Sequence, residues 1–250
     1  MGVLDNCVAL ITGASRGFGR ATAKAFIDEG AEVVLHYRES RAECEELSAY
    51  AQRRGQSARL VQADFGNPNS IRRFESWLGD ECDTIDVLVN NAGVMQTGPF
   101  LDDDEASWQR QIDVNILGPL RITRAVAPII ARKQHGKIIN IASQLALRAW
   151  DSGAVYAGTK GFILSWTKSL AMELGPLGIR VNAIGPGSIV TDMNRSVYPD
   201  AQSLEAKAAE LPLRHMGAPE DVAACAVFLA SDASDFVTGQ MLGVNGGSQM

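Results

Sequence analysis

Three side chains in the second half of the chain are suited to moving a proton at a carbonyl or alcohol oxygen. Tyr156 and Lys160 are four positions apart in a segment with helical character, so they should share one face of that helix. A free tyrosine has a pKa of about 10, which makes it a poor acid or base at neutral pH. A neighbouring ammonium group should lower that pKa, and Tyr156 would then act as a general acid or base.

Ser143 lies 13 residues before Tyr156, at the expected end of a strand. Its hydroxyl group is placed to hydrogen-bond a substrate oxygen and to stabilise charge that develops there. Each of these residues alone has a simpler interpretation. A lone Tyr-x-x-x-Lys is usually an exposed helix face, and a serine at a strand end is usually a cap or turn residue. The catalytic interpretation therefore depends on the motifs that accompany them.

A glycine-rich turn lies between the apolar run 8–11 and a helical pattern that starts at Gly17. It reads Thr12-Gly13-Ala14-Ser15-Arg16-Gly17-Phe18-Gly19, with the spacing G-x-x-x-G-x-G. Glycines let a backbone turn sharply and approach a pyrophosphate, and a helix N-terminus offers free N–H groups to the phosphates. The turn predicts a dinucleotide site, with a plain glycine-rich turn as the alternative.

Apolar runs alternate with helical patterns along the whole chain. Strands are expected at 8–11, 33–35, 58–62, 87–89, 137–141, 180–184 and 241–244, and helices at 17–29, 41–54, 71–78, 107–132, 155–174 and 219–229, with kinks at Pro119 and Pro128. Apolar runs without alternation are typical of strands buried on both faces. The pattern predicts one α/β domain, with a doubly wound, seven-stranded parallel sheet. The segment 188–213 interrupts the pattern and is expected to form a lid over the crevice at the strand ends.

Further motifs occur in a fixed order. Asn90-Asn91-Ala92-Gly93 follows the fourth strand, Asn115 lies in the next helix, Pro186-Gly187 and Thr191 follow the sixth strand, and Val244-Asn245-Gly246-Gly247 lies near the end. With the glycine turn, Ser143 and Tyr-x-x-x-Lys, this ordered set resembles the short-chain dehydrogenase/reductase family over essentially all 250 residues. The resemblance implies a Rossmann fold, a nicotinamide cofactor and hydride transfer to or from a carbonyl or alcohol carbon.

The resemblance also implies roles for individual residues. Asn115, Ser143, Tyr156 and Lys160 would be catalytic, with Asn115 anchoring a water chain and Lys160 also bonding the nicotinamide ribose. Asp64 would lie at the adenine edge, although a helix or turn cap is the alternative. The expected cofactor-binding set is Gly13, Ser15, Arg16, Gly17, Phe18, Gly19, His36, Tyr37, Arg38, Asp64, Phe65, Asn91, Ala92, Gly93, Tyr156, Lys160, Pro186, Gly187, Ile189 and Thr191.

The end of the second strand bears on the choice between NADP and NAD. NAD-preferring Rossmann proteins place a carboxylate there, whereas this chain reads His36-Tyr37-Arg38. Arg16 stands where NADP-using members of the family carry a basic residue, and Arg38 adds a second guanidinium suited to phosphate. Pairing with Glu39, or simple exposure, is the alternative for Arg38. NADP(H) is therefore favoured, and NAD(H) remains possible.

The substrate is less well determined. Gln144, Trp150, Ser188 and Met193 are the expected substrate contacts. The nearest likenesses are β-ketoacyl-acyl-carrier-protein reductases, acting on 3-oxoacyl thioesters, and sugar or polyol dehydrogenases. Met172 stands where many of those reductases have a basic residue, which argues against a carrier-protein partner. The leading interpretation is NADP(H)-dependent action on a thioester or small ketone. The alternatives are an NAD-dependent sugar or polyol dehydrogenase and a non-catalytic nucleotide-sensing regulator.

Composition narrows the remaining possibilities. The net charge of −6 argues against nucleic acid or anionic membranes as partners. The four cysteines are scattered, which predicts reduced thiols in a cytoplasmic protein and no metal site. No apolar run approaches the roughly 20 residues of a membrane span. The family resemblance further implies a homotetramer, with the helices at 107–132 and 155–174 buried between subunits and small residues such as Gly158 and Gly161 at the contact.

Overall fold

A parallel sheet forms the centre of the molecule in the computed structural model, which describes residues 2–194 and 197–250. Its seven strands are β1 (Val8–Ile11), β2 (Glu32–Tyr37), β3 (Ala58–Gln62), β4 (Val87–Asn90), β5 (Gly136–Ile141), β6 (Ile179–Pro186) and β7 (Met241–Val244). They lie in the order β3-β2-β1-β4-β5-β6-β7, and every neighbouring pair is parallel. The predicted doubly wound sheet is confirmed. The order reverses between β1 and β4, where such folds open a crevice at the strand ends.

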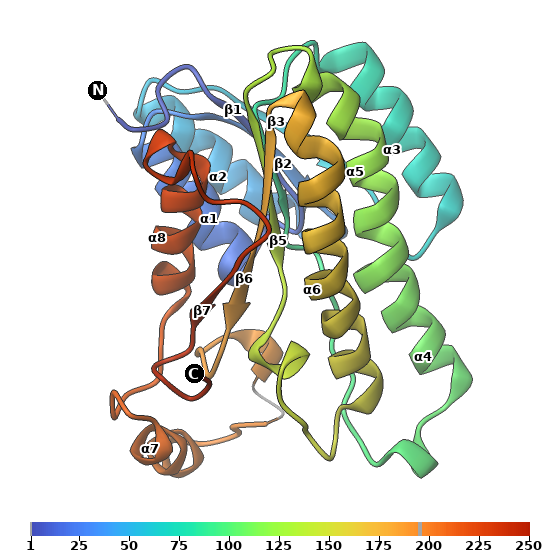
Figure 1. The fold of residues 1–250 in the computed structure, drawn as a ribbon, viewed down its shortest axis with the longest axis vertical. Coiled ribbons are helices and arrows are strands. Elements are labelled where there is room, and N and C mark those ends of the chain that lie inside the picture. The colour runs from blue at the N-terminus through green and yellow to red at the C-terminus, as the bar shows by residue number, and fades with distance from the viewer. Residues whose placement is uncertain (1, 195–196) are drawn as a thin grey trace.

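Helices cover both faces of this sheet. They are α1 (Gly17–Asp28), α2 (Arg41–Arg53), α3 (Pro68–Glu81), α4 (Glu105–Ile112), α5 (Gly118–Ala131), α6 (Ala154–Leu174), α7 (Ala201–Glu210) and α8 (Pro219–Ala230). Figure 1 shows α1, α2 and α8 on one face and α3, α5 and α6 on the other. The short helix α7 stands apart from both layers, at the end of the molecule where β6 terminates.

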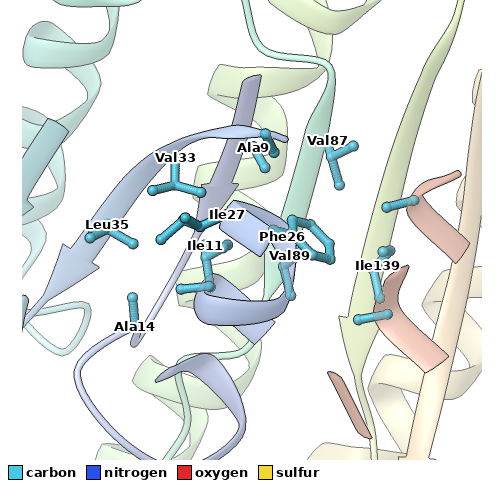
Figure 2. Close-up of a cluster of buried hydrophobic side chains, with 14 of the residues drawn as sticks. Ala9, Ile11, Ala14, Phe26, Ile27, Val33, Leu35, Val87, Val89 and Ile139 are labelled. Atoms are coloured by element: carbon cyan, nitrogen blue, oxygen red, sulfur yellow. The ribbon is translucent and has the colours of Figure 1, made fainter. Parts of the chain in front are cut away.

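Alternate residues of each strand supply two separate cores. In β1, Ile11 packs in the core beneath α1, whereas Leu10 packs in the core beneath α3 and α5. Figure 2 shows part of the first core, in which Phe26 and Ile27 of α1 lie over strand residues Ala9, Ile11, Val33, Leu35, Val87, Val89 and Ile139. Each fully buried side chain of this size contributes about 1.5–3 kcal/mol to folding. Burial on both faces explains why apolar and polar residues do not alternate along the sequence of these strands.

The long helix predicted over 107–132 is interrupted. After α4, the residues Asp113–Leu117 form a turn of π-helix, and α5 starts only at Gly118. Pro119 lies in the first turn of α5, where a missing N–H costs nothing, and α5 continues past Pro128 as one element. Contrary to the expectation from the sequence, the stretch Glu105–Ala131 is long and apolar enough to cross a membrane by length and composition alone. Half of its most apolar 18-residue window is buried inside the fold.

Candidate active site

A cavity of about 540 Å³ opens at the carboxyl ends of the strands. Residues from the glycine turn, the ends of β2 to β6 and the segment 188–213 all line it. Most of the predicted site residues lie there: Gly13, Ser15, Arg16, Gly17, Phe18, His36, Arg38, Asp64, Phe65, Asn91, Ala92, Gly93, Ser143, Gln144, Trp150, Tyr156, Lys160, Pro186, Gly187, Ser188, Thr191 and Met193. The structure thus brings most of the predicted cofactor residues, and three of the four predicted catalytic residues, to one cavity.

Four predicted residues do not line the cavity: Gly19, Tyr37, Asn115 and Ile189. Tyr37 was expected to contact cofactor, but its side chain is buried in the core beneath α1 because the alternation of β2 turns it away from the crevice. Ile189 is likewise buried in that core. Gly19 acts through packing, since a Cβ atom there would lie 2.1 Å from the carbonyl oxygen of Gly13.

The glycine turn has the backbone geometry of a phosphate cradle. Gly13 and Gly17 have φ angles of +66° and +53°, a region that glycine adopts without strain. A Cβ atom on Gly17 would meet nothing within 4 Å, so the backbone there borders open space. Thr12 holds the turn to the loop after β4, because its Oγ1 accepts hydrogen bonds from the N–H groups of Asn91 and Ala92, both at 2.9 Å. This cradle fits the diphosphate of a dinucleotide.

His36 has a different role from the predicted cofactor contact. Its Nδ1 accepts a hydrogen bond from the N–H of Gly13 at 3.1 Å, and its Nε2 lies 3.0 Å from the carbonyl oxygen of Ala63. These partners require a neutral ring with the proton on Nε2. The ring also stacks on Phe65, with centroids 4.2 Å apart. Burial lowers the pKa of His36 to about 4. His36 therefore ties the glycine turn to β3 and supports one wall of the cavity.

The charged residues near the end of β2 differ in their availability. The guanidinium of Arg16 is exposed and has no hydrogen-bond or ion-pair partner among the described residues, whereas Arg38 pairs with Glu39 at 3.1 Å. Asp64 pairs with Arg110 at 2.9 Å and accepts a hydrogen bond from the N–H of Gly66. Partial burial opposes ionisation of Asp64, but these hydrogen bonds outweigh it and lower its pKa. Asp64 lines the cavity and also caps a turn.

Ser143, Tyr156 and Lys160 are each more than nine-tenths buried and line the same cavity. Burial raises the pKa of Tyr156 to about 12, against the opposing effect of a hydrogen bond with Ser143. Burial also lowers the pKa of Lys160 to about 8. The expectation that Lys160 lowers the pKa of Tyr156 was therefore wrong for this state of the site. The Lys160 Nζ lies 5.7 Å from the centroid of the Tyr156 ring and donates to the carbonyl oxygen of Ile141 at 2.8 Å.

Asn115 does not line the cavity, but its side chain connects two elements that do. It lies in the π-helical turn, where its Oδ1 accepts from the N–H of Val94 and its Nδ2 donates to the Val94 carbonyl oxygen and the Thr159 hydroxyl oxygen. These bonds join the loop after β4 to α6, the helix of Tyr156 and Lys160. Its side chain is thus committed to protein contacts, and anchoring of a water chain stays a prediction.

The four substrate candidates all line the cavity, and Gln144 contacts the C-terminal tail there. The Oε1 of Gln144 accepts a hydrogen bond from the Ser248 hydroxyl at 2.5 Å. Ser188 is 5% exposed, and its hydroxyl has no hydrogen-bond partner among the described residues. Arg110, Arg148, Asp192 and Lys207 also line the cavity, and the sequence interpretation did not select them. Arg148 lies five positions after Ser143, and this short separation is the one signal in the sequence that could have pointed to it.

A group of potential metal ligands lies away from this cavity, at His135, Asp232 and Asp235. All three residues are exposed. Lys137 already pairs with Asp232 at 3.3 Å, and Arg180 pairs with Asp235 at 3.0 Å. These cations compensate the carboxylates, so the cluster is an ion-pair network.

The chain is similar to proteins of known family over its full length. A family model described as enoyl-(acyl carrier protein) reductase matches residues 13–249. A 3-oxoacyl-[acyl-carrier-protein] reductase from Synechocystis is 37% identical and matches over 100% of both chains. A 3beta-hydroxysteroid dehydrogenase 1 from Eggerthella lenta is also 37% identical, over 98% of this chain and 94% of its own.

Comparison with a solved structure shows a similar fold as well. A gluconate 5-dehydrogenase from Burkholderia cenocepacia, in complex with NADP and tartrate, is 33% identical, has a TM-score of 0.91 and matches over 98% of this chain and 95% of its own. Sequence, fold and the arrangement of the cavity therefore agree. The chain belongs to the short-chain dehydrogenase/reductase family, whose members are oxidoreductases acting on carbonyl and alcohol groups.

Proposed function

We propose that this protein is an NADP(H)-dependent oxidoreductase that reduces the carbonyl group of a small metabolite. The observation that carries the proposal is that Ser143, Tyr156 and Lys160 line the same cavity as the glycine turn. When bound, the cofactor supplies the hydride. The chain's own residues then need only hold the carbonyl oxygen and deliver one proton to it.

Ser143 holds the substrate oxygen through its hydroxyl group, and Tyr156 donates the proton. With a pKa of about 12, Tyr156 is protonated at neutral pH, which suits the acid needed for reduction better than the base needed for oxidation. Lys160 is held by the Ile141 carbonyl oxygen beside this tyrosine and is placed to bind the nicotinamide ribose. All three side chains are more than nine-tenths buried, so few solvent molecules compete with the substrate for their polar atoms.

The cofactor assignment rests on the mouth of the cavity. The cradle of Gly13 and Gly17 would take the diphosphate, and Phe65, backed by His36, would form a wall for the adenine ring. Arg16, with Arg38 beside it, would bind the 2′-phosphate of NADP. The NADP in the related gluconate 5-dehydrogenase structure supports this choice.

The remaining assignments come from the family. We propose a single domain over residues 1–250 with a lid at about 188–213, a cytoplasmic homotetramer, and Asn115 as anchor of a proton-relaying water chain. The related 3-oxoacyl-[acyl-carrier-protein] reductase supports an oxoacyl thioester as substrate, and the related gluconate 5-dehydrogenase supports a sugar acid. A non-catalytic regulator would not need the catalytic pair, and this chain keeps both Tyr156 and Lys160.

The test is a titration of purified protein with NADPH and NADH, followed by a carbonyl panel with the tighter cofactor. We expect NADPH to bind at least about tenfold more tightly, a difference of about 1.4 kcal/mol, and a ketone in the panel to consume it. Equal or tighter binding of NADH would move the assignment to an NAD-dependent polyol dehydrogenase. Binding without turnover of any carbonyl would favour the regulator.

A further inference from the structure

Two cations in the cavity have no role in the proposed chemistry. Six basic side chains line the cavity, against the three acidic ones of Glu39, Asp64 and Asp192, although the whole chain has a net charge of −6. Four of the basic residues are accounted for: Arg16 and Arg38 at the cofactor phosphate, Arg110 on Asp64, and Lys160 beside Tyr156. Arg148 and Lys207 remain.

Arg148 belongs to the catalytic side of the cavity. It follows the short helix Gln144–Ala146 that begins directly after Ser143, and its N–H donates to the Gln144 carbonyl oxygen at 3.2 Å. Its guanidinium is partly buried and has no hydrogen-bond or ion-pair partner within residues 2–194 and 197–250. A guanidinium left without a carboxylate inside a cavity is a ready site for a planar anion.

Lys207 lines the same cavity from a different element, the helix α7. That helix lies beyond the sheet, in the segment that follows β6 (Figure 1). Lys207 pairs with the exposed Glu210 at 2.7 Å, and Glu210 also feels the charge of Arg148, so the two cations share one neighbourhood. These three groups together carry two positive charges and one negative charge, and the whole cavity lining has six basic side chains against three acidic ones, Asp192 included.

The cavity also offers an unused hydrogen-bonding group. Ser188 lines the cavity and is only 5% exposed. Its hydroxyl group has no hydrogen-bond partner among the described residues. A buried hydroxyl without a partner costs free energy, which a ligand atom would recover. We infer that the substrate carries a carboxylate, held by Arg148 and Lys207, with a neighbouring polar atom bonded by Ser188. This inference rests on the proposed carbonyl reduction and narrows its substrate class to oxo acids.

The test compares oxo acids with their uncharged esters. Pyruvate, acetoacetate and levulinate place the ketone at increasing distance from the carboxylate, and each methyl ester keeps the ketone while removing the charge. With saturating NADPH, we expect kcat/KM for the best acid to exceed that of its ester by about tenfold or more. Equal values for acid and ester throughout would overturn the inference while leaving the proposed reductase intact.

Charge-removing variants locate the effect. Arg148→Gln should reduce the acid-over-ester preference by about tenfold, mainly through KM. Lys207→Gln should reduce this preference less, because the ion pair with Glu210 already neutralises part of the Lys207 charge. Arg73→Gln is the matched control, since Arg73 is an exposed arginine on α3 outside the cavity. An unchanged preference in Arg148→Gln, or an equal loss in Arg73→Gln, would contradict the assignment.

A binding measurement separates this inference from the proposed function. Succinate, which has no ketone, is titrated calorimetrically into the protein with and without NADP. We expect it to bind the wild-type protein and to bind Arg148→Gln at least about tenfold more weakly. Equal binding to both proteins would overturn the carboxylate site. If no carbonyl is reduced at all, the proposed function fails, and this titration alone decides the carboxylate site.

Discussion

At the scale of single residues, burial controls the protonation of the catalytic pair. Lys160 carries its charge below a pKa of about 8 and loses it above, whereas Tyr156 keeps its proton up to about pH 12. We expect carbonyl reduction to proceed at a constant rate near neutral pH and to decline above about pH 8, as Lys160 becomes neutral. A pH profile of kcat measures this directly.

The control is Lys160→Arg, because a guanidinium stays charged across this range. It should have a lower rate at every pH but no decline near pH 8. A decline of the same size in both proteins would show that another group is responsible.

The two arginines at the cofactor end should contribute unequally. Arg16 has no partner among the described residues, whereas Arg38 is already paired with Glu39. We expect Arg16→Gln to weaken NADPH binding by about tenfold, roughly 1.4 kcal/mol, and Arg38→Gln to weaken it less. NADH, which lacks the 2′-phosphate, should bind both variants almost as it binds the wild-type protein. A parallel loss of NADH affinity in Arg16→Gln would count against a phosphate contact.

Single residues also mark the limit of the sequence interpretation. Tyr156, Lys160 and Ser143 were found because each has a fixed spacing in an ordered set of motifs. Arg148 and Lys207 belong to no such pattern, since they lie 59 positions apart and only the folded segment after β6 brings them to one cavity. Tyr37 was misplaced because the second strand was expected only over 33–35, whereas β2 continues through Tyr37, and alternation along the strand turns this side chain into the core.

At the scale of elements, His36 connects the glycine turn, β2 and β3. Its ring must stay neutral to accept from Gly13, and burial lowers its pKa to about 4, compared with about 6.5 in an unfolded chain. Between these values the unfolded chain takes up a proton that the folded protein does not. Lowering the pH from 6.5 to 4 should therefore cost up to about 3 kcal/mol of folding free energy.

Urea unfolding at several pH values measures this cost. In His36→Asn, an amide oxygen can accept from Gly13 but no group titrates, so the dependence of stability on pH across this window should become shallower. Identical slopes for the variant and the wild-type protein would mean that His36 does not set the acid stability.

The break in the predicted long helix has a cause that periodicity does not reveal. The apolar pattern continues through 107–132, and Pro119 indicated only that some distortion would occur. The buried Asn115 side chain needs partners in two other elements, Val94 after β4 and Thr159 on α6. A π-helical turn brings it to both, and such turns are frequent at functional sites. Because those partners are distant in sequence, the turn was not predictable from the segment itself.

At the scale of the whole molecule, α6 presents a surface that suits association with further copies of the chain. Gly158 is an exposed glycine inside this helix, and a Cβ atom there would meet nothing within 4 Å in one chain. Gly161, three positions further along α6, is equally free of neighbours, and each helical glycine costs about 1 kcal/mol relative to alanine, so a close helix–helix contact on this face would explain the pair. If the proposed tetramer forms, Gly158→Leu should lower the molecular mass measured by light scattering below that of the wild-type protein.

Gly79→Leu is the matched control, because Gly79 is a helical glycine on α3 that is equally free of neighbours. Its mass should be that of the wild-type protein. A monomeric wild-type protein, or a Gly158→Leu variant of unchanged mass, would remove α6 from the interface.

The central claim is that one cavity holds NADP(H) and uses Tyr156 to protonate a carbonyl oxygen. The most direct measurement is NADPH consumption with the best ketone, in the wild-type protein and in Tyr156→Phe, together with the NADPH affinity of both. We predict that the variant binds NADPH within about threefold of the wild-type protein yet loses at least about a hundredfold in kcat. Turnover by Tyr156→Phe close to that of the wild-type protein would contradict the account.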